Sequence, residues 1–208
     1  MGARGSRLSR AQVDEVYQEL SRFYPHIRFF PIWISTTGDQ DKTTSLKTLE
    51  KSNFFTDAID HRQLQGEFRI SIHSAKDLPD PLHPDLEMIA LTKGVDSSDS
   101  LVVRAFPIPY GAQIGVSSHR REAFLKSWRR DLECVDIRGT IDERLALLDN
   151  GTIDGVITAE AALIRLKLTD RPRIHLDIDT AKMQGRLAVL ARKNDHEMKQ
   201  LFTVIHHE

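Results

Sequence analysis

Residues 113–158 read QIGVSSHRREAFLKSWRRDLECVDIRGTIDERLALLDNGTIDGVIT, and this stretch decides the fold class. Three short runs of strand-forming residues divide it: Gln113–Val116, Leu132–Ile137 and Gly155–Thr158. Between them, apolar side chains recur three and four residues apart in two segments, Ser118–Arg130 and Ile141–Asn150. Strands that alternate with amphipathic helices predict βαβ units, and therefore an α/β fold with mixed, mostly parallel sheets flanked by helices.

The same alternation continues on both sides of this stretch. It predicts further strands at His26–Ser35, Phe68–His73, Asp85–Thr92, Ser100–Arg104, Arg173–Ile178 and Leu187–Arg192. It predicts further helices at Ser9–Phe23, Leu46–Leu64, Ala159–Leu168 and Asp195–Ile205. Pro31 lies inside the first of these strands and indicates an edge position or a bulge, because proline cannot donate a ladder hydrogen bond.

Turn-forming residues break the pattern at two places. Asp80–Pro84 and Gly94–Ser100 bracket one strand, and an irregular stretch at Asp177–Gly185 precedes another. Two breaks in a chain of 208 residues predict two domains, the second inserted into the first. We expect residues 1–94 and 185–208 in domain 1 and residues 95–184 in domain 2, with a ligand cleft at the strand ends between them.

Composition excludes several classes of protein. With 40% hydrophobic and 28% charged residues the chain can bury a core, so wholesale disorder is excluded. The 29 basic and 30 acidic residues nearly cancel, so no global field favours nucleic acid or a membrane surface. No run of apolar residues is long enough to predict a transmembrane helix.

The single cysteine and the first residues bear on location. Cys134 is the only cysteine, which excludes an internal disulfide framework and fits a reducing compartment. Residues 1–10 carry arginines but no apolar run, so we expect no secretory signal. These features predict a soluble cytoplasmic monomer with no nucleic-acid or membrane partner.

The loop HSAKDLP, residues 73–79, follows a predicted strand and carries a cation beside a carboxylate, Lys76 and Asp77. Open α/β sheets bind ligands at the carboxyl ends of their strands, so this pair is a candidate for chemistry. The alternative is a solvated turn in which Asp77 satisfies local backbone groups. For an isolated Lys-Asp pair that alternative is the more common case.

The segment GVSSHRR, residues 115–121, leads from a strand into a helix. Hydroxyls and backbone N–H groups at a helix N-terminus form an anion site, and Arg120 and Arg121 add positive charge. Cations are unfavourable at that end of the helix dipole, so something negative must compensate them. In the alternative reading both arginines are exposed and pair with Glu122 or with solvent.

Further arginines follow other strands. In DIRGT, residues 136–140, Thr140 and Glu143 fit a capping box, with Arg138 just before the cap and Arg144 one turn into the helix. Arg4 and Arg165 stand near other strand ends. Each alone reads as a surface residue. Together they indicate a small ligand with many carboxylates, which planar guanidinium groups bind well.

Four motifs in order resemble the porphobilinogen deaminase (hydroxymethylbilane synthase) family. They are GARGSRLSRAQ at 2–12, HSAKDLP at 73–79, IGVSSHRREAFL at 114–125 and DLECVDIRGTIDERLALLDNGTIDGVI at 131–157. The resemblance implies a transferase of tetrapyrrole and heme biosynthesis that condenses four porphobilinogen molecules into hydroxymethylbilane and releases ammonia. It also implies two domains like those of periplasmic binding proteins, followed by a third.

The resemblance further implies roles for individual residues. Asp77, beside Lys76, would be the catalytic carboxylate. The residues that would bind the carboxylates of a dipyrromethane cofactor, of porphobilinogen and of linear oligopyrroles are Arg4, Ser6, Lys51, Ser74, Ser117, Ser118, Arg120, Arg121, Arg138, Arg144 and Arg165.

The sequence departs from the family at several positions. Thr56, Val116, Thr140 and Arg186 stand where the family has lysine, threonine, asparagine and alanine. LFTVIHHE at 201–208 resembles the segment that leads into the family's third domain, so we expect that domain, and the cysteine that anchors the cofactor, to be absent.

Neither Cys134 nor the terminal histidines suggest a replacement for that anchor. Cys134 falls within a predicted strand and reads as a small hydrophobic residue, and His206 and His207 lack the spacing of metal ligands. We therefore expect no metal site and no cofactor-attachment cysteine. The chain is either a fragment or a short form that holds its primer without a covalent bond. A catalytically silent two-domain protein that binds carboxylated pyrroles is the alternative to the transferase.

Overall fold

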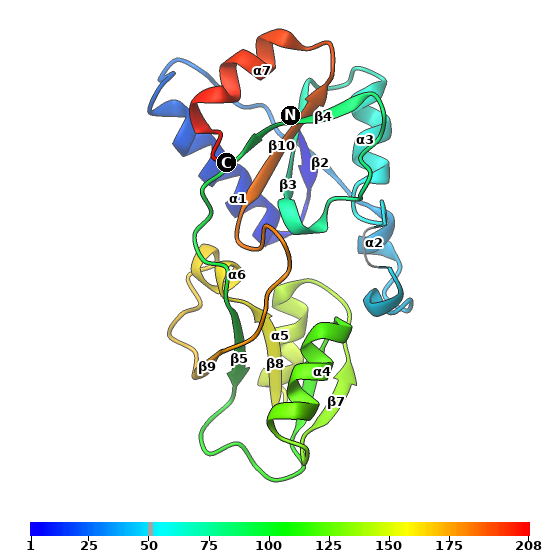
Figure 1. The fold of residues 1–208 in the computed structure, drawn as a ribbon, viewed down its shortest axis with the longest axis vertical. Coiled ribbons are helices and arrows are strands. Elements are labelled where there is room, and N and C mark those ends of the chain that lie inside the picture. The colour runs from blue at the N-terminus through cyan, green and yellow to red at the C-terminus, as the bar shows by residue number, and fades with distance from the viewer. Residues whose placement is uncertain (50–51) are drawn as a thin grey trace. The chain divides into compact units, whose positions relative to one another are not determined.

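The computed structural model describes residues 1–49 and 52–208, and these residues form two compact units. Unit 1 holds the described residues of 1–40, 52–96 and 181–208. Unit 2 holds residues 41–49 and 97–180. Each unit contains its own sheet with helices packed against it, and Figure 1 labels most of these elements.

The sheet of unit 1 has the strand order β2-β1-β3-β10-β4. Its strands are β1 (Gly2–Arg4), β2 (Ile32–Ile34), β3 (Ile70–Ser74), β4 (Leu86–Leu91) and β10 (Leu187–Arg192). β1 pairs in parallel with β2 and β3, whereas β10 is antiparallel to both β3 and β4. Only β10 therefore runs against the other strands of this sheet.

Helices cover both faces of the unit 1 sheet. They are α1 (Arg7–Ser21), α3 (Asp57–Leu64) and α7 (His196–Phe202). The unit also contains the short helix α2 (Thr37–Gln40) and 3-10 turns at Ala75–Asp77 and Thr203–Ile205. α1 begins where the Ser6 side chain accepts a hydrogen bond from the backbone N–H of Ser9. Its apolar face buries Val16 and Leu20 against β3 and β10, and α3 buries Ile59 in a separate cluster.

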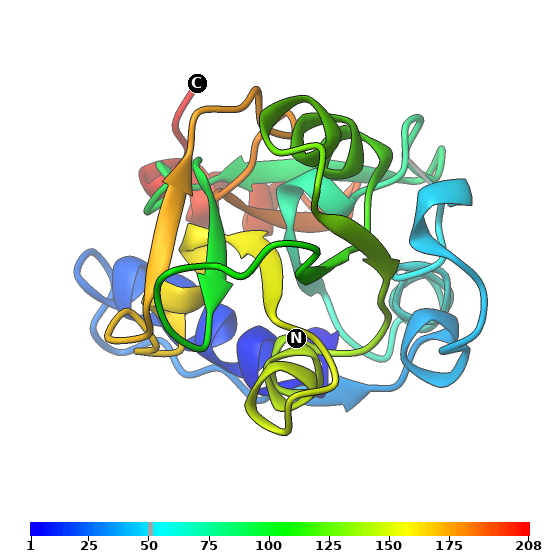
Figure 2. The ribbon, with the colours of Figure 1, turned by 90° about the horizontal axis from the view of Figure 1, so that it is seen from below.

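The sheet of unit 2 has the order β7-β6-β8-β5-β9. Its strands are β5 (Asp99–Val103), β6 (Gln113–Val116), β7 (Glu133–Asp136), β8 (Gly155–Ala159) and β9 (Arg173–Leu176). β6 pairs in parallel with β7 and β8, whereas β5 is antiparallel to β8 and to β9, as Figure 2 shows for β5 and β9. The predicted mixed, mostly parallel sheets are thus confirmed in both units.

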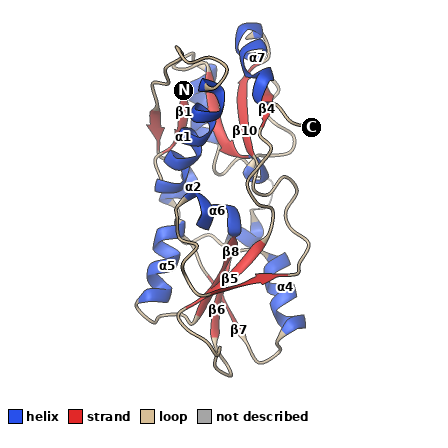
Figure 3. Cartoon of the chain, turned by 90° about the vertical axis from the view of Figure 1, so that its left-hand side faces the viewer, coloured by secondary structure: helices blue, strands red, loops and turns tan. Residues whose placement is uncertain are grey.

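The helices of unit 2 are α4 (His119–Trp128), α5 (Ile141–Asp149) and α6 (Glu160–Arg165), with a 3-10 turn at Leu46–Thr48. α4 and α5 lie on opposite sides of the sheet (Figure 3). The strand order explains this arrangement, because α4 connects β6 to β7 on one side and α5 then leads back past β6 to β8. In both units the first strand of the parallel set lies between the second and the third.

Two predicted elements are wrong in extent. The strand predicted at His26–Ser35 is limited to β2, which begins directly after Pro31. The single helix predicted at Leu46–Leu64 is a 3-10 turn and α3, with Ser52–Thr56 outside any helix. β1 and α2 are additional elements that no periodicity predicts, because three or four residues are too few to show one.

The structure also groups residues 41–49 with unit 2, whereas the predicted boundaries place them in domain 1. Their side chains explain the grouping. Lys42 pairs with Glu143, Ser45 donates a hydrogen bond to Asp136, and Lys47 Nζ lies 2.6 Å from Glu122 Oε2. These partners are distant in sequence, so local turn chemistry could not show the boundary.

The two segments that lead out of and back into unit 1 pass very close to each other. Gly185 has φ +84°, and a Cβ atom added there would lie 2.0 Å from the carbonyl oxygen of Asp96. Thr92 accepts a hydrogen bond from Arg186 Nε at its carbonyl oxygen (2.7 Å), and its Oγ1 accepts another from the N–H of Leu187 (2.9 Å). Glycine is therefore required at position 185 for both its backbone conformation and its lack of a side chain.

Gly185→Ala should lower the free energy of unfolding by at least about 3 kcal/mol, because it adds a left-handed alanine to a backbone clash. Gly111→Ala is the matched control, since Gly111 has φ +70° and nothing within 4 Å of an added Cβ. Gly111→Ala should lower the free energy of unfolding by only about 1 kcal/mol. Urea unfolding of both variants measures the difference, and equal midpoints would show that the close approach is no constraint.

Candidate functional site

Four strand ends of unit 2 meet at one edge of its sheet. The parallel strands β6, β7 and β8 all end there, and β5 begins there because Asp99 pairs with Ala159. The loops at this edge carry Ser117, Ser118 and Arg138, and Arg120 lies in the first turn of α4. Since β6 lies between β7 and β8, this edge is the point at which the strand order reverses, the usual ligand position in such sheets.

The N-terminus of α4 is built around a buried carboxylate. Arg121 Nη2 and Nε donate to Asp99 Oδ1 (2.7 Å) and Oδ2 (3.1 Å), and Arg121 Nη1 donates to the carbonyl oxygen of Ile157 (3.2 Å). Arg120 Nη2 donates to Asp99 Oδ2 (2.7 Å). The side chain of Asp99 is 0% exposed and that of Arg121 is 7% exposed. Asp99 is therefore the compensating charge that two arginines at a helix start require.

The Asp99 carboxylate is ionised despite its burial. Burial alone would raise its pKa, but the hydrogen bonds and positive charges of Arg121 and Arg120 outweigh it and lower the pKa to about 2. The sequence predicts that Arg120 and Arg121 need an acidic partner, but it does not show which residue that is. Asp99 lies in a turn-rich segment far from both arginines in the sequence, and only the folded sheet brings it to them. Glu122, the partner considered in the alternative reading, binds Lys47 and Lys126 instead.

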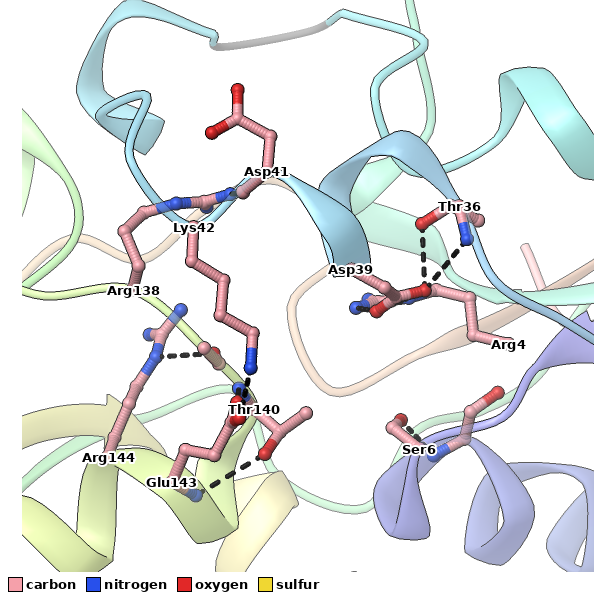
Figure 4. Close-up of polar contacts among 12 residues, drawn as sticks. Arg4, Ser6, Thr36, Asp39, Asp41, Lys42, Arg138, Thr140, Glu143 and Arg144 are labelled. Carbon is pink, nitrogen blue, oxygen red and sulfur yellow. Dashed lines mark hydrogen bonds and ion pairs between the residues drawn. The ribbon is translucent and has the colours of Figure 1, made fainter.

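The predicted capping box of α5 is confirmed. Thr140 Oγ1 accepts from the backbone N–H of Glu143, and the Glu143 carboxylate accepts from the N–H of Thr140 (2.7 Å). Arg144 Nε donates to the carbonyl oxygen of Gly139 (2.9 Å) and Nη1 to Ser117 Oγ (2.9 Å). Arg138 Nη2 donates to the carbonyl oxygen of Asp41. Figure 4 draws both arginines with the capping box of α5. These bonds hold both guanidinium groups, half-buried, beside the start of α5.

In unit 1 the equivalent position follows β1. Arg4 binds Asp39 through Nε (3.1 Å to Oδ1) and lies over the ring of Phe55, 4.5 Å from its centroid. Asp39 Oδ2 also accepts from the N–H and the hydroxyl of Thr36 (Figure 4). Burial acts to raise the pKa of Asp39, but these hydrogen bonds and the charge of Arg4 lower it overall. Ser6, two residues further, caps α1.

The loop after β3 carries the predicted catalytic pair. Ser74 Oγ accepts from Gln12 Nε2 (2.8 Å), and Lys76 Nζ donates to Gln184 Oε1 (3.1 Å). Asp77 ends the 3-10 turn Ala75–Asp77 and is exposed.

A buried chain of hydrogen bonds supports this loop from behind. Gln63 Nε2 donates to the carbonyl oxygens of Arg69 and Leu190, so its Oε1 accepts from the hydroxyl of Ser71 (2.7 Å). That hydroxyl has one hydrogen, so it accepts from His73 Nε2 (2.9 Å). Burial, together with the charge of Arg4, lowers the pKa of His73 to about 4. His73 is therefore neutral, with its proton on Nε2.

The other predicted residues are less closely grouped. Arg165 is half-buried at the end of α6, and Lys51 lies outside the described residues. Cys134 is paired with Ile114 in the middle of the β6–β7 ladder, and burial raises the pKa of its thiol. The described residues contain no cluster of three or more His, Cys, Asp or Glu side chains that could hold a metal ion. None of the described helices has the length and apolar character needed to cross a bilayer.

Comparison with known proteins identifies the family. Residues 1–200 match the family described as porphobilinogen deaminase, dipyromethane cofactor binding domain. The chain is 39% identical over 210 residues to a probable porphobilinogen deaminase of Chlamydia pneumoniae, covering 99% of this chain and 89% of that protein. The chain belongs to the porphobilinogen deaminase family. A second porphobilinogen deaminase, from Desulforudis audaxviator, is 35% identical over 214 residues, which are 100% of this chain and 69% of that protein.

Two solved structures show the same fold. The periplasmic VFT2 domain of Bordetella pertussis BvgS superposes with a TM-score of 0.52 at 15% identity, over 92% of this chain and 75% of that one. An amino acid ABC transporter substrate-binding protein from Streptococcus pneumoniae superposes with a TM-score of 0.52 at 15% identity, over 94% of this chain and 75% of that one. The predicted fold, like that of periplasmic binding proteins, is thus confirmed.

Asp99→Asn should destabilise unit 2 by on the order of 3 kcal/mol at pH 7, because it leaves Arg121 buried without its counter-charge. A carboxylate with a lowered pKa contributes stability above its unfolded pKa of about 4 and loses it as the pH falls through the folded value of about 2. The difference between wild type and variant in urea unfolding should therefore narrow between about pH 4 and pH 2.

Asp149→Asn is the control for that measurement. Asp149 also makes a two-bond contact with an arginine, Arg171, but it is 53% exposed. Its removal should cost less than about 1 kcal/mol. If Asp99→Asn and Asp149→Asn lower the free energy of unfolding equally, burial does not strengthen the contribution of the Asp99–Arg121 pair to stability.

Proposed function

We propose that this chain binds porphobilinogen and linear oligopyrroles by their carboxylates and condenses porphobilinogen units with release of ammonia. The observation that carries this proposal is the edge of the unit 2 sheet where two capped helix N-termini and the guanidinium groups of Arg120, Arg138 and Arg144 come together. Backbone N–H groups and arginines are the two standard ways in which proteins bind carboxylates.

In this proposal the arginines divide into two groups. Arg138 and Arg144 are half-buried, and hydrogen bonds to the carbonyl oxygens of Asp41 and Gly139 and to Ser117 orient their guanidinium groups. Ser117 and Ser118 add hydroxyl groups beside them. Arg121 directs its donors to Asp99 and Ile157, so it contributes by fixing Asp99 and, through Asp99, the neighbouring Arg120.

Asp77 is the proposed catalytic residue, in unit 1. When ammonia leaves porphobilinogen, the bond between the methylene carbon and the amine nitrogen breaks, and the electron pair departs with the nitrogen. Positive charge then spreads over the pyrrole ring to its N–H group. A carboxylate that accepts a hydrogen bond from this N–H stabilises the charge as it develops. The exposure of Asp77 at the end of its turn supports this role, since a substrate can reach it.

The other side chains of the loop prepare it for this step. Ser74 and Lys76 are held by Gln12 and Gln184, which fixes the turn that presents Asp77. Arg4, Ser6 and Arg165 complete the proposed set of ligand-binding residues. Lys51, also in that set, lies outside the described residues. A new carbon–carbon bond to the methylene carbon, with loss of a proton from the attacking pyrrole carbon, then completes each condensation.

The dipyrromethane cofactor of the family fits this chain in one respect only. Its carboxylates suit the arginines of unit 2, and when bound it serves as the primer to which pyrrole units are added. A thioether to Cys134 does not fit, because that residue lies within β7, packs on the core of unit 2 and has a thiol whose pKa is raised by burial. We therefore propose that the primer is bound through its carboxylates. A pyrrole-binding protein without turnover remains the second candidate.

Asp77→Asn should lower kcat for porphobilinogen consumption by roughly 10²–10³ with little change in KM, because it removes one oriented charge from the transition state. The urea midpoint should not change, since asparagine satisfies a turn as well as aspartate does. Asp85→Asn, at a carboxylate that is 77% exposed, is the control and should keep full activity. Full activity of Asp77→Asn would contradict the catalytic role and would show that Asp77 only stabilises the turn.

Arg138→Leu should weaken porphobilinogen binding roughly ten- to a hundredfold, the contribution of one hydrogen-bonded charge pair. Arg171→Leu is the control, because Arg171 binds Asp149 at the surface of the same unit, and its affinity for porphobilinogen should be that of wild type. Isothermal titration measures both. This measurement also tests the second candidate, which predicts the same loss of binding but no turnover in the wild-type chain.

A further inference from the structure

The side chain of Arg186 joins segments of unit 1 that are far apart in the sequence. Arg186 directly precedes β10. Its Nε donates to the carbonyl oxygen of Thr92 (2.7 Å), and its Nη2 donates to the carbonyl oxygen of His207 (2.5 Å). Thr92 directly follows β4, and His207 lies in the terminal segment of the chain. One guanidinium group therefore holds both of these segments against the start of β10.

The path of this side chain crosses a glycine. Gly94 has φ +86°, and a Cβ atom added there would lie 2.9 Å from Arg186 Cγ. The stem of Arg186 therefore passes close to a residue that has no side chain to obstruct it. Arg186 is half-buried, and hydrogen bonds of a charged donor are stronger where water competes less for them.

The terminal segment is fixed at the same place by further hydrogen bonds. The backbone N–H of His207 donates to the carbonyl oxygen of Leu91 (2.8 Å), and the N–H of Leu91 donates to His206 Nδ1 (3.2 Å). His207 Nε2 also lies 3.8 Å from Glu19 Oε1. β4 is an edge strand of the sheet, and these bonds occupy both backbone groups of its last residue. Arg186 thus binds a segment that covers the end of a sheet edge.

The main chain of Arg186 and the side chain of Gln184 hold the loop that carries Asp77. The carbonyl oxygen of Arg186 accepts a hydrogen bond from the N–H of Ala75 (3.0 Å), the first residue of the 3-10 turn Ala75–Asp77. Ala75 is buried, so this bond is shielded from water. Lys76 Nζ donates to Gln184 Oε1 (3.1 Å). Arg186 therefore binds the terminal segment with its side chain and the Asp77 turn with its main chain.

We propose that Arg186 is a positioning residue, which couples the terminal segment at residues 206 and 207 to the turn that presents Asp77. A side chain bound to two carbonyl oxygens fixes the conformation of residue 186, and the main-chain carbonyl of that residue then holds Ala75 in place. When the terminal segment loosens, Arg186 loses one partner and the turn is held less firmly. This inference rests on the proposed function, since the catalytic role of Asp77 belongs to it.

The test replaces Arg186 by methionine in the whole chain. Arg186→Met keeps an unbranched side chain beside Gly94 but has no hydrogen-bond donor. The amide hydrogen of Ala75, followed by NMR hydrogen exchange under native conditions, should exchange about tenfold faster than in wild type, because the bonds of a charged group are lost. The kcat for porphobilinogen consumption should fall about tenfold with KM unchanged, because a displaced Asp77 acts less well in the chemical step.

Two further variants show whether the hydrogen bonds and the terminal segment are responsible. Arg186→Lys keeps the charge and a donor, so it should recover part of the slow exchange and part of kcat. His206→Ala removes the acceptor for the N–H of Leu91 and loosens the terminal segment without changing Arg186. It should speed the exchange of Ala75 in the same direction as Arg186→Met, by a smaller factor.

Arg28→Met is the matched control. Arg28 also donates to two backbone carbonyl oxygens in unit 1, those of Pro25 (3.0 Å) and Ile27 (2.9 Å), but both belong to its own segment of the chain. This variant should leave the exchange of Ala75 and kcat at their wild-type values.

A residue that only stabilises unit 1 would lower the urea midpoint in Arg186→Met without changing kcat or the exchange of Ala75, and that result overturns the proposal. Faster exchange with unchanged kcat overturns the positioning role. Faster exchange in Arg186→Met but not in His206→Ala overturns the coupling to the terminal segment. If Arg186→Met fails to fold, Arg186→Lys and His206→Ala decide.

The exchange measurement needs no turnover, so it separates this proposal from the proposed function. If the wild-type chain does not consume porphobilinogen, the proposed function fails, and the exchange of Ala75 in the three variants then decides the coupling on its own.

Discussion

The Asp99 carboxylate is the point on which unit 2 depends. Three elements meet at it: the first residue of β5, the first turn of α4 and, through the Ile157 carbonyl that Arg121 also binds, the strand β8. A carboxylate removed from water to this extent is stable only with full compensation, and here two guanidinium groups provide it. The edge of the sheet that carries the candidate carboxylate-binding residues is thus organised by an internal carboxylate.

The two units repeat one construction. In each, the first strand of a parallel set lies between the other two, and the helix that follows it is capped by a serine, Ser6 in unit 1 and Ser118 in unit 2. In each, one strand runs against the others. These strands, β5 and β10, are the first ones after the crossings at residues 96–97 and 180–181. The reversal is therefore a property of the paired crossings, which Gly185 and Asp96 bring into backbone contact within unit 1.

Much of the secondary structure of unit 2 could be predicted, because the patterns that specify it lie within short segments of the sequence. Strands and helices alternate with clear periods between residues 113 and 158, and the capping box of Thr140 and Glu143 fixes one helix start. Other features depend on contacts between distant residues. The pairing of Asp99 with Arg121 and the attachment of residues 41–49 to unit 2 through Lys42 and Lys47 have no local signature.

The same distinction applies to the candidate site. The arginines and serines near the strand ends follow from the motifs, because the motifs lie where strands lead into turns or helices. The burial of each side chain does not follow from the motifs. Arg121 is buried in unit 2, Arg138 is half-buried and Asp77 is exposed. Sequence spacing places a side chain near an edge, but burial and partners decide whether it faces a ligand or the protein interior.

The hydrogen-bond chain behind the Asp77 loop couples two positions of the sequence. Gln63 directs the hydroxyl of Ser71, and Ser71 in turn determines which nitrogen of His73 carries the proton. A glutamate at position 63 would have no N–H to give to the carbonyl oxygens of Arg69 and Leu190, and a histidine with the opposite tautomer could not donate to Ser71. Through Ser71, residue 63 therefore bears on the tautomer of His73 at the start of the Asp77 loop, so a substitution at position 63 acts on that loop without touching it.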